Sequence, residues 1–261
     1  MTTTSQQPHD TAAVAPARPA RPTEFTLWKA CAWAGPVFIL ALFVFWMLVA
    51  RFFPPPGADW TAGQTAEFFA GHSVRIRIGM EGAMAFAMFY FVWSLAIAGV
   101  MRRMEGRERL LSSIQVIGGV GTAWITMGCA LCWLTASFRA ASRPPDDIQL
   151  LCDLGWMIFD ITAMATMLQQ VAIGIAILVD DRPTPLMPRW LGYLTFWLTA
   201  TTFVVYLMPF FVTGPFAWQG LITLYVALAA FFTWAILVSR YTLVAIRRIE
   251  REERGVHAVP A

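Results

Sequence analysis

Six long apolar stretches constrain the fold of this chain more than any other feature of its sequence. They cover roughly residues 28–53, 74–101, 113–138, 150–181, 190–213 and 217–246. A helix crosses the hydrocarbon core of a bilayer in about 20 residues, so each stretch is long enough to span it. Hydrophobic residues make up 58% of the chain and charged residues only 13%, whereas about a quarter of an ordinary soluble domain is charged. The sequence therefore predicts an all-α fold, a polytopic transmembrane helical bundle of six spans.

The segments outside the spans divide the chain into three parts. Residues 1–26 are rich in Thr, Gln, Ala and Pro without an apolar run, and we expect a disordered tail there. Residues 27–247 form the six-helix domain, and residues 248–261 form a charged tail. Within the domain, prolines at positions 54–56 end the first span, and Asp59 can cap a short helix over residues 60–71. This helix is too short to cross the bilayer, so we expect it to lie at the membrane surface.

Arginines are concentrated on one side of the predicted bundle. The loop after the second span and the end of the sixth span carry four each, namely Arg102, Arg103, Arg107 and Arg109, and Arg247, Arg248, Arg251 and Arg254. The positive-inside rule places these segments, and with six spans both termini, in the cytoplasm. The chain has 18 arginines and a single lysine, a bias typical of GC-rich genomes. We therefore expect a multi-pass protein of the bacterial cytoplasmic (inner) membrane, surrounded by lipid.

The fourth apolar stretch contains two carboxylates, Asp153 and Asp160. A charge near the centre of a bilayer costs roughly 2.5–3.5 kcal/mol on insertion scales, so it requires a partner, a water-filled cavity or a proton. If the stretch is one helix, the spacing places both carboxylates on one face, with Asp160 roughly 10 Å deeper. Further along this span, we expect Gln169 and Gln170 to form hydrogen bonds between helices.

Two further charges, Arg77 and Glu81, lie in the first turns of the second span. That span and the fourth both run inward in the predicted topology, so their charged ends meet near the outer surface. One hypothesis is an outward-facing, ligand-binding pocket built from four residues, Arg77, Glu81, Asp153 and Asp160. The other is that Arg77 and Glu81 form a local ion pair, four residues apart on one helical face, while both aspartates cap or bond neighbouring helices.

Metal, haem and hydrolase chemistry find little support in the sequence. The histidines, His9, His72 and His257, lie outside the apolar stretches, which excludes a buried bis-histidine haem and a histidine-rich metal site. No Ser–His pair or phosphate-binding loop is evident. Cys129 and Cys132 form a CxxC pattern, but inside an apolar span where a redox motif would lack water. We therefore expect no catalytic residues, no cofactor and no metal, and a non-enzymatic role is favoured.

Four segments, FPPPGADWTA, RIRIG, DDRPTPLMPRWLGYL and FFVTGPFAWQG, resemble a family of bacterial six-helix integral membrane proteins with PRW and TGPFAWxG motifs. The resemblance covers most of the chain after about residue 45. It implies one intact six-span unit in a bacterial inner membrane, and it implies no activity, cofactor or catalytic residue.

The turn at residues 213–220 either lines the mouth of a pocket or forms a tight hairpin in which Trp218 anchors the chain at the membrane surface.

Two classes of function remain open. In the first, the outer polar pocket binds or transports a small or amphipathic molecule, and Asp160 titrates or pairs with it. In the second, the chain is a non-catalytic membrane subunit or scaffold of a larger complex, and its partner is another membrane protein or a second copy of itself. Nothing in the sequence points to nucleic acid. The classes differ in whether Arg77, Glu81 and Asp160 converge on a cavity or are consumed in interhelical pairs.

Overall fold

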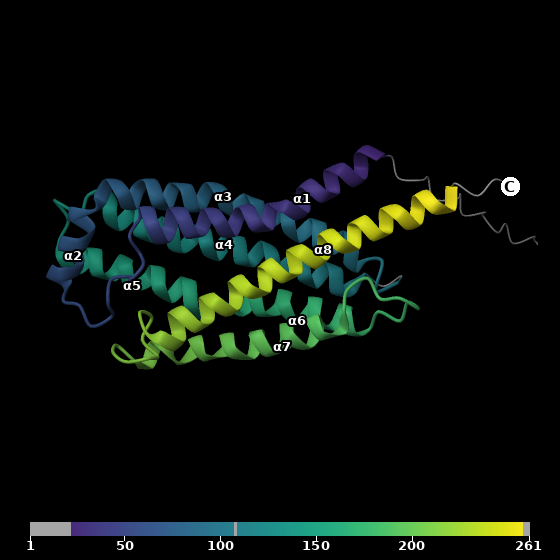
Figure 1. The fold of residues 1–261 in the computed structure, drawn as a ribbon. Coiled ribbons are helices and arrows are strands. Elements are labelled where there is room, and N and C mark those ends of the chain that lie inside the picture. The colour runs from purple at the N-terminus through teal and green to yellow at the C-terminus, as the bar shows by residue number, and fades with distance from the viewer. Residues whose placement is uncertain (1–21, 107–108, 258–261) are drawn as a thin grey trace, which may run out of the picture.

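The structure is a computed structural model that describes residues 22–106 and 109–257, and all regular elements in these two ranges are helices (Figure 1). The α-helices are α1 (Pro22–Ala41), α2 (Ala62–Gly71), α3 (Ser73–Met101), α4 (Leu110–Phe138), α5 (Pro145–Ile161), α6 (Met164–Leu178), α7 (Arg189–Thr202) and α8 (Ala227–His257). Three tighter or wider helices join them: η1 (Leu42–Val49) and η3 (Leu221–Val226) are π-helices, and η2 (Phe203–Phe210) is a 3₁₀ helix.

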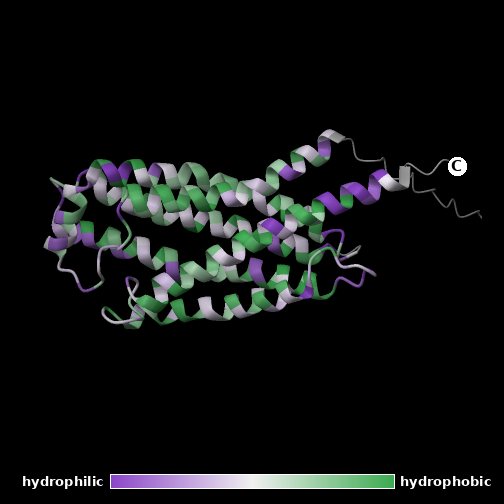
Figure 2. Cartoon of the chain, in the orientation of Figure 1, coloured by the Kyte–Doolittle hydropathy of each residue, from purple (hydrophilic) through white to green (hydrophobic). Residues whose placement is uncertain are grey.

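These helices combine into six segments that are long and apolar enough to cross a membrane. The segments are Thr23–Val49, Ser73–Met101, Leu110–Phe138, Pro145–Leu178, Arg189–Phe210 and Leu221–Gly255. Large apolar side chains point outward along them, among them Leu40, Trp124, Trp197 and Phe203, each more than 60% exposed. In water such a surface would aggregate, whereas in lipid it is solvated. The prediction of a six-span transmembrane bundle is confirmed, and Figure 2 shows hydrophilic residues gathered mainly toward the two ends of the bundle.

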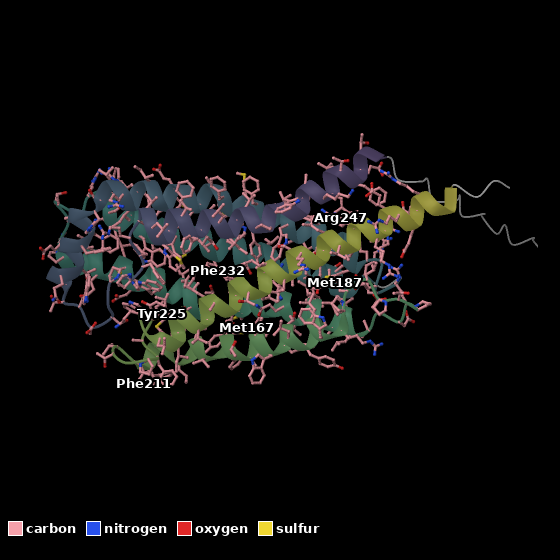
Figure 3. The ribbon with its side chains drawn as sticks, viewed as in Figure 1. Met167, Met187, Phe211, Tyr225, Phe232 and Arg247 are labelled. Atoms are coloured by element: carbon pink, nitrogen blue, oxygen red, sulfur yellow. The ribbon has the colours of Figure 1, made fainter. Side chains whose placement is uncertain are left out.

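Both ends of the described chain lie at one end of the bundle, which we call the terminal end, and α2 lies at the opposite end, the α2 end (Figure 1). In Figure 3, Phe211 and Tyr225 lie toward the α2 end and Arg247 lies toward the terminal end. An even number of spans places both termini on the same side of a membrane. Which side is cytoplasmic stays a prediction from the arginine distribution.

The first and last spans extend further at the terminal end than expected. Helix α1 begins at Pro22, so residues 22–26 are helical instead of belonging to the predicted tail, and residues 1–21 lie outside the described residues. Proline suits the first turn of a helix, where its missing N–H has no partner to lose. Helix α8 continues to His257 because pairs four residues apart, Arg248–Glu252 at 2.9 Å and Glu250–Arg254 at 2.6 Å, support its charged turns.

Ion pairs tie the other segments of the terminal end to α8. Lys29 of α1 pairs with Glu250, Arg103 pairs with Glu253 at 2.8 Å, and Arg182 pairs with Glu252 at 2.8 Å. All five ion pairs among the described residues lie at this end. Each exposed pair contributes little by itself, up to about 1 kcal/mol. Together they hold α1 and the segments that contain Arg103 and Arg182 against the charged end of α8.

At the α2 end, the short helix begins at Ala62 and is capped by Thr61, not by Asp59 as expected. The Thr61 hydroxyl accepts a hydrogen bond from the Gln64 backbone N–H at 3.3 Å, and the Gln64 side chain accepts one from the Thr61 N–H at 2.9 Å. This reciprocal arrangement is a capping box, which satisfies two otherwise unpaired N–H groups. A threonine three residues before a glutamine was the signal for it in the sequence.

Small residues let α4 approach α6 closely. A Cβ atom placed on Gly118 would lie only 2.7 Å from the backbone oxygen of Ala165 and 2.7 Å from the backbone nitrogen of Gln169. Without a hydrophobic driving force between helices in lipid, such close packing is a main source of attraction. The contact fixes the third span against the second half of the fourth.

Candidate functional site

The sequence predicted one continuous helix for the fourth span, but the structure forms two. Helix α5 ends at Ile161, α6 begins at Met164, and Thr162 and Ala163 form the break. The Ala163 N–H donates to the backbone oxygen of Asp160 at 3.3 Å, and the Ala165 N–H donates to the backbone oxygen of Thr162 at 3.3 Å. These bonds between residues three apart tighten the turn. The Thr162 hydroxyl also donates to the Ile158 oxygen. Side-chain bonds of this kind bend helices.

Three other spans also leave the α-helical form. The first changes to a π-helix at Leu42, the sixth begins as a π-helix over Leu221–Val226, and the fifth tightens to a 3₁₀ helix at Phe203. In the fifth span, Pro209 supplies a reason, because it cannot donate a hydrogen bond to the preceding turn. The 3₁₀ segment begins at Phe203, several residues before this proline.

The four irregular spans border one cavity of about 80 Å³. Irregular backbone at membrane depth is tolerated where it is buried in protein or lines a cavity, and π-helical turns are frequent at functional sites. The residues lining the cavity are apolar apart from one carboxylate and five hydroxyls; they are Phe38, Leu42, Thr122, Ile125, Thr126, Phe159, Asp160, Ala163, Thr166, Thr202, Val205, Thr223, Ala227, Leu228 and Phe231.

Asp160 is the one charged residue of this lining. It lies near the middle of the 34-residue span Pro145–Leu178, in the last turn of α5, and only 4% of it is exposed. Its Oδ2 is buried and has no hydrogen-bond partner among the described residues, and none of their ion pairs includes it. A buried carboxylate is normally paired or hydrogen-bonded. Asp160 is therefore an exception that calls for a functional explanation.

The other three predicted site residues do not join Asp160. The Arg77 Nε donates to the Ser73 backbone oxygen at 3.2 Å, Glu81 is exposed, and Asp153 is half-buried on α5. None of the three borders the Asp160 cavity, and none is in an ion pair among the described residues. The structure thus forms neither the four-residue pocket nor the Arg77–Glu81 pair. Charged side chains near the ends of spans reach the interface instead of turning inward.

The expected role of the two glutamines is confirmed. The Gln169 amide accepts from the Tyr90 hydroxyl at 2.7 Å and donates to the Ser94 hydroxyl at 3.2 Å, which joins α6 to α3. The Gln170 oxygen accepts from the Thr199 hydroxyl at 3.0 Å, which joins α6 to α7. In membranes such bonds contribute about 0.6 kcal/mol each on average. They position α6, which begins directly after the break.

A cluster of tryptophans connects the cavity wall to the loops of the α2 end. Phe159, which lines the cavity, lies 5.1 Å from Trp46, and Trp46 and Trp218 both contact Trp156 at about 6 Å between ring centroids. The Trp218 indole N–H donates to the Pro56 oxygen at 2.8 Å. Trp218 is buried and so does not act as a membrane-surface anchor, as one hypothesis had it. The turn at residues 213–220 instead packs against the loop around Pro56, to which Trp218 donates this hydrogen bond.

Metal or disulfide chemistry has no counterpart in the described residues. No three His, Cys, Asp or Glu side chains among them are placed to hold a metal ion. All four cysteines, Cys31, Cys129, Cys132 and Cys152, are free, and Cys129 and Cys152 are buried. Cys129 and Cys132 both lie within α4, where Cys129 is buried and Cys132 is half-buried.

Compared with known proteins, the chain matches no protein-family model, no curated protein and no solved structure. The family resemblance of its loop motifs stays a prediction. The candidate site therefore depends on geometry alone. Sequence reasoning found Asp160 but missed the threonines that line the cavity beside it. The one signal for them was their number in otherwise apolar spans.

Proposed function

We propose that this multi-pass membrane protein binds a small or amphipathic molecule in the Asp160 cavity, as a binding protein or as a transporter of the bacterial inner membrane. One observation carries the proposal: a buried, unpartnered carboxylate borders a cavity at a helix break near the middle of the fourth span. Transport proteins of many kinds place their sites at broken helices near the bilayer midplane.

The alternative, a scaffold that uses its charges to lock helices together, explains the terminal end better than it explains Asp160. There, Lys29, Arg103 and Arg182 each pair with a glutamate of α8. A carboxylate retained only to hold helices would be expected to have such a partner. Asp160 has none among the described residues, and an apolar residue at its place would pack without that cost.

The size of the cavity limits what enters it. Its volume is about 80 Å³, roughly half that of an engineered apolar cavity of about 150 Å³ that binds benzene. The cavity therefore suits a molecule, or the head of an amphipathic molecule, with only a few heavy atoms.

A cavity-filling variant tests the proposal. Ala227→Leu adds three carbons to the cavity wall, whereas Ala85→Leu, the matched control, adds them on an exposed position of α3. The proteins are purified in mild detergent and their bound small molecules are identified by native mass spectrometry. We expect wild type and Ala85→Leu to retain a bound molecule and Ala227→Leu to lose it. A wild-type protein without a bound molecule, or equal retention in all three, would contradict the proposal.

A further inference from the structure

We propose that the Asp160 cavity selects a compact protonated amine, an alkylammonium ion, and this inference rests on the proposed binding function. The reason is that, with Asp160 ionised, oxygens of the protein can accept every hydroxyl proton of the lining, so that its polar side chains are left with lone pairs to offer. The argument follows the proton of each hydroxyl in turn, since a threonine has only one.

Four of the five hydroxyls donate to backbone oxygens. Within α4, the Thr122 hydroxyl donates to the backbone oxygen of Gly118 at 3.0 Å, and the Thr126 hydroxyl donates to the backbone oxygen of Thr122 at 3.1 Å. Thr202 donates to the Leu198 oxygen at 3.0 Å and Thr223 donates to the Phe216 oxygen at 2.9 Å. Each of these oxygens then has only lone pairs to offer to a ligand.

The fifth hydroxyl belongs to Thr166, whose oxygen lies 2.9 Å from the hydroxyl oxygen of Thr122. One arrangement engages both protons: Thr122 donates to the Gly118 oxygen, and Thr166 donates to the Thr122 hydroxyl oxygen. The remaining polar group is the Asp160 carboxylate, and the other lining residues carry only hydrocarbon side chains. In this arrangement, and with Asp160 ionised, the polar side chains of the cavity are all acceptors and carry one full negative charge.

Such a lining discriminates strongly by charge. An anion or a carbonyl compound would find no side-chain donor and would face a carboxylate. A neutral alcohol could donate one proton but would leave the buried charge uncompensated, which is unfavourable. A protonated amine supplies both several N–H donors and the opposite charge, and charge-assisted hydrogen bonds are about twice as strong as neutral ones.

The apolar part of the lining favours an organic cation over a bare metal ion. Phe38, Phe159 and Phe231 border the cavity, and aromatic rings attract cations that lie over their faces. A hard metal ion requires a shell of six or more oxygen ligands in most sites, whereas an alkyl group on the ammonium matches the hydrocarbon wall. The volume of about 80 Å³ limits that group to a few carbons.

The test uses the full-length protein in detergent with ethylammonium chloride as the probe. Ethanol and acetate serve as neutral and anionic counterparts of similar size, and sodium chloride serves at the same ionic strength. Binding is followed by melting temperature and by tryptophan emission, because Trp46 lies 5.1 Å from the cavity residue Phe159. We expect a saturable effect of ethylammonium and no saturable effect of the other three.

Two pairs of variants assign the effect to the cavity. Asp160→Asn should weaken ethylammonium binding about tenfold or more, while Asp153→Asn, on the same helix but away from the cavity, should leave it unchanged. Thr126→Val removes one acceptor and should weaken binding severalfold, while Thr135→Val, on the same helix but outside the cavity lining, should not. Size-exclusion profiles and melting of the free proteins establish that the variants are folded, and the threonine pair tests the inference if Asp160→Asn is not.

The inference is overturned if ethanol or acetate binds as well as ethylammonium, or if sodium alone gives the saturable effect. It is also overturned if ethylammonium has no effect, or if its effect survives both Asp160→Asn and Thr126→Val. In each of these cases the proposed binding function can still stand, because loss of the bound molecule in Ala227→Leu reports on it separately. Conversely, ethylammonium binding that is unchanged in Ala227→Leu would place the amine outside the cavity and overturn the inference.

Discussion

At the scale of single residues, the side chain that matters most is Asp160, whose buried Oδ2 has no partner among the described residues. A carboxylate in this position destabilises the empty protein, because burial removes its hydration and nothing replaces it. A ligand that restores the missing interactions stabilises the folded state by mass action. The same side chain would then destabilise the protein without a ligand and hold the ligand when one is bound.

This balance predicts the effect of Asp160→Asn on the free protein. The amide keeps the size of the side chain and removes the charge, so we expect the melting temperature in detergent to stay the same or rise. If Asp160 were half of a buried ion pair, its removal would instead cost about 3–5 kcal/mol. A large loss of thermal stability that Arg77→Gln restores would therefore contradict the structure, in which Arg77 donates to the Ser73 oxygen.

The residues of the site could be predicted from the sequence only in part. Asp160 stood out because a carboxylate inside an apolar stretch is rare. Thr122, Thr126 and Thr166 did not, because threonines in transmembrane helices commonly bond to their own backbone and carry no positional signal. Arg77 and Glu81 were grouped with Asp160 by depth, but long side chains near the end of a span can reach the interface in another direction.

At the scale of elements, the six spans were predictable and their irregularities were not. Hydropathy over about 20 residues is a strong signal, and it located all six. The break at Thr162–Ala163 contains no proline or glycine, so local rules favour a continuous helix there. The interruption coincides with the bond of the Thr162 hydroxyl to the Ile158 backbone oxygen and with the cavity that the neighbouring spans border, and hydropathy signals neither of them.

Two glycines of α4 test how closely its neighbours pack. A Cβ on Gly118 would meet backbone atoms of α6 at 2.7 Å, whereas a Cβ on Gly128 would meet only Ile158 Cγ2 at an ordinary 3.5 Å. Gly118→Ala should lower the free energy of unfolding by about 1–3 kcal/mol, as overpacking does. Gly128→Ala should be neutral or stabilising, because alanine is favoured over glycine in helices by about 1 kcal/mol. Equal melting temperatures for the two variants would contradict the close α4–α6 contact.

At the scale of the whole molecule, the bundle has one charged, ion-paired end and one end closed by α2 and the loops around Pro56 and Trp218. The arginine distribution predicts that the terminal end faces the cytoplasm. Thiol labelling of intact cells tests this in a background without native cysteines. Gly63→Cys, exposed on α2, should react with a membrane-impermeant reagent added outside, while Thr65→Cys, 3% exposed on the same helix, should not.

A reporter fused after Ala261 provides the complementary measurement. With the terminal end in the cytoplasm, a reporter that requires the cytoplasm should be active there and one that requires the periplasm should not. Labelling of Gly63→Cys only after lysis, together with a periplasm-active reporter, would reverse the orientation of the whole bundle. The six-span fold itself would be unaffected by that result.

The sixth span also determines when the cavity is completed during biosynthesis. Thr223, Leu228 and Phe231 form one part of its wall, and this span leaves the ribosome after the other five. Until α8 inserts beside α1, Asp160 faces lipid or the insertion machinery. A chain that stops after Phe216 should therefore be degraded faster than the full-length chain in a pulse–chase experiment. Asp160→Asn should slow the degradation of this shortened chain. Equal half-lives for the shortened chain with and without Asp160→Asn would contradict this prediction. The carboxylate that we propose anchors a ligand in the finished protein would then direct an unfinished chain to membrane proteases.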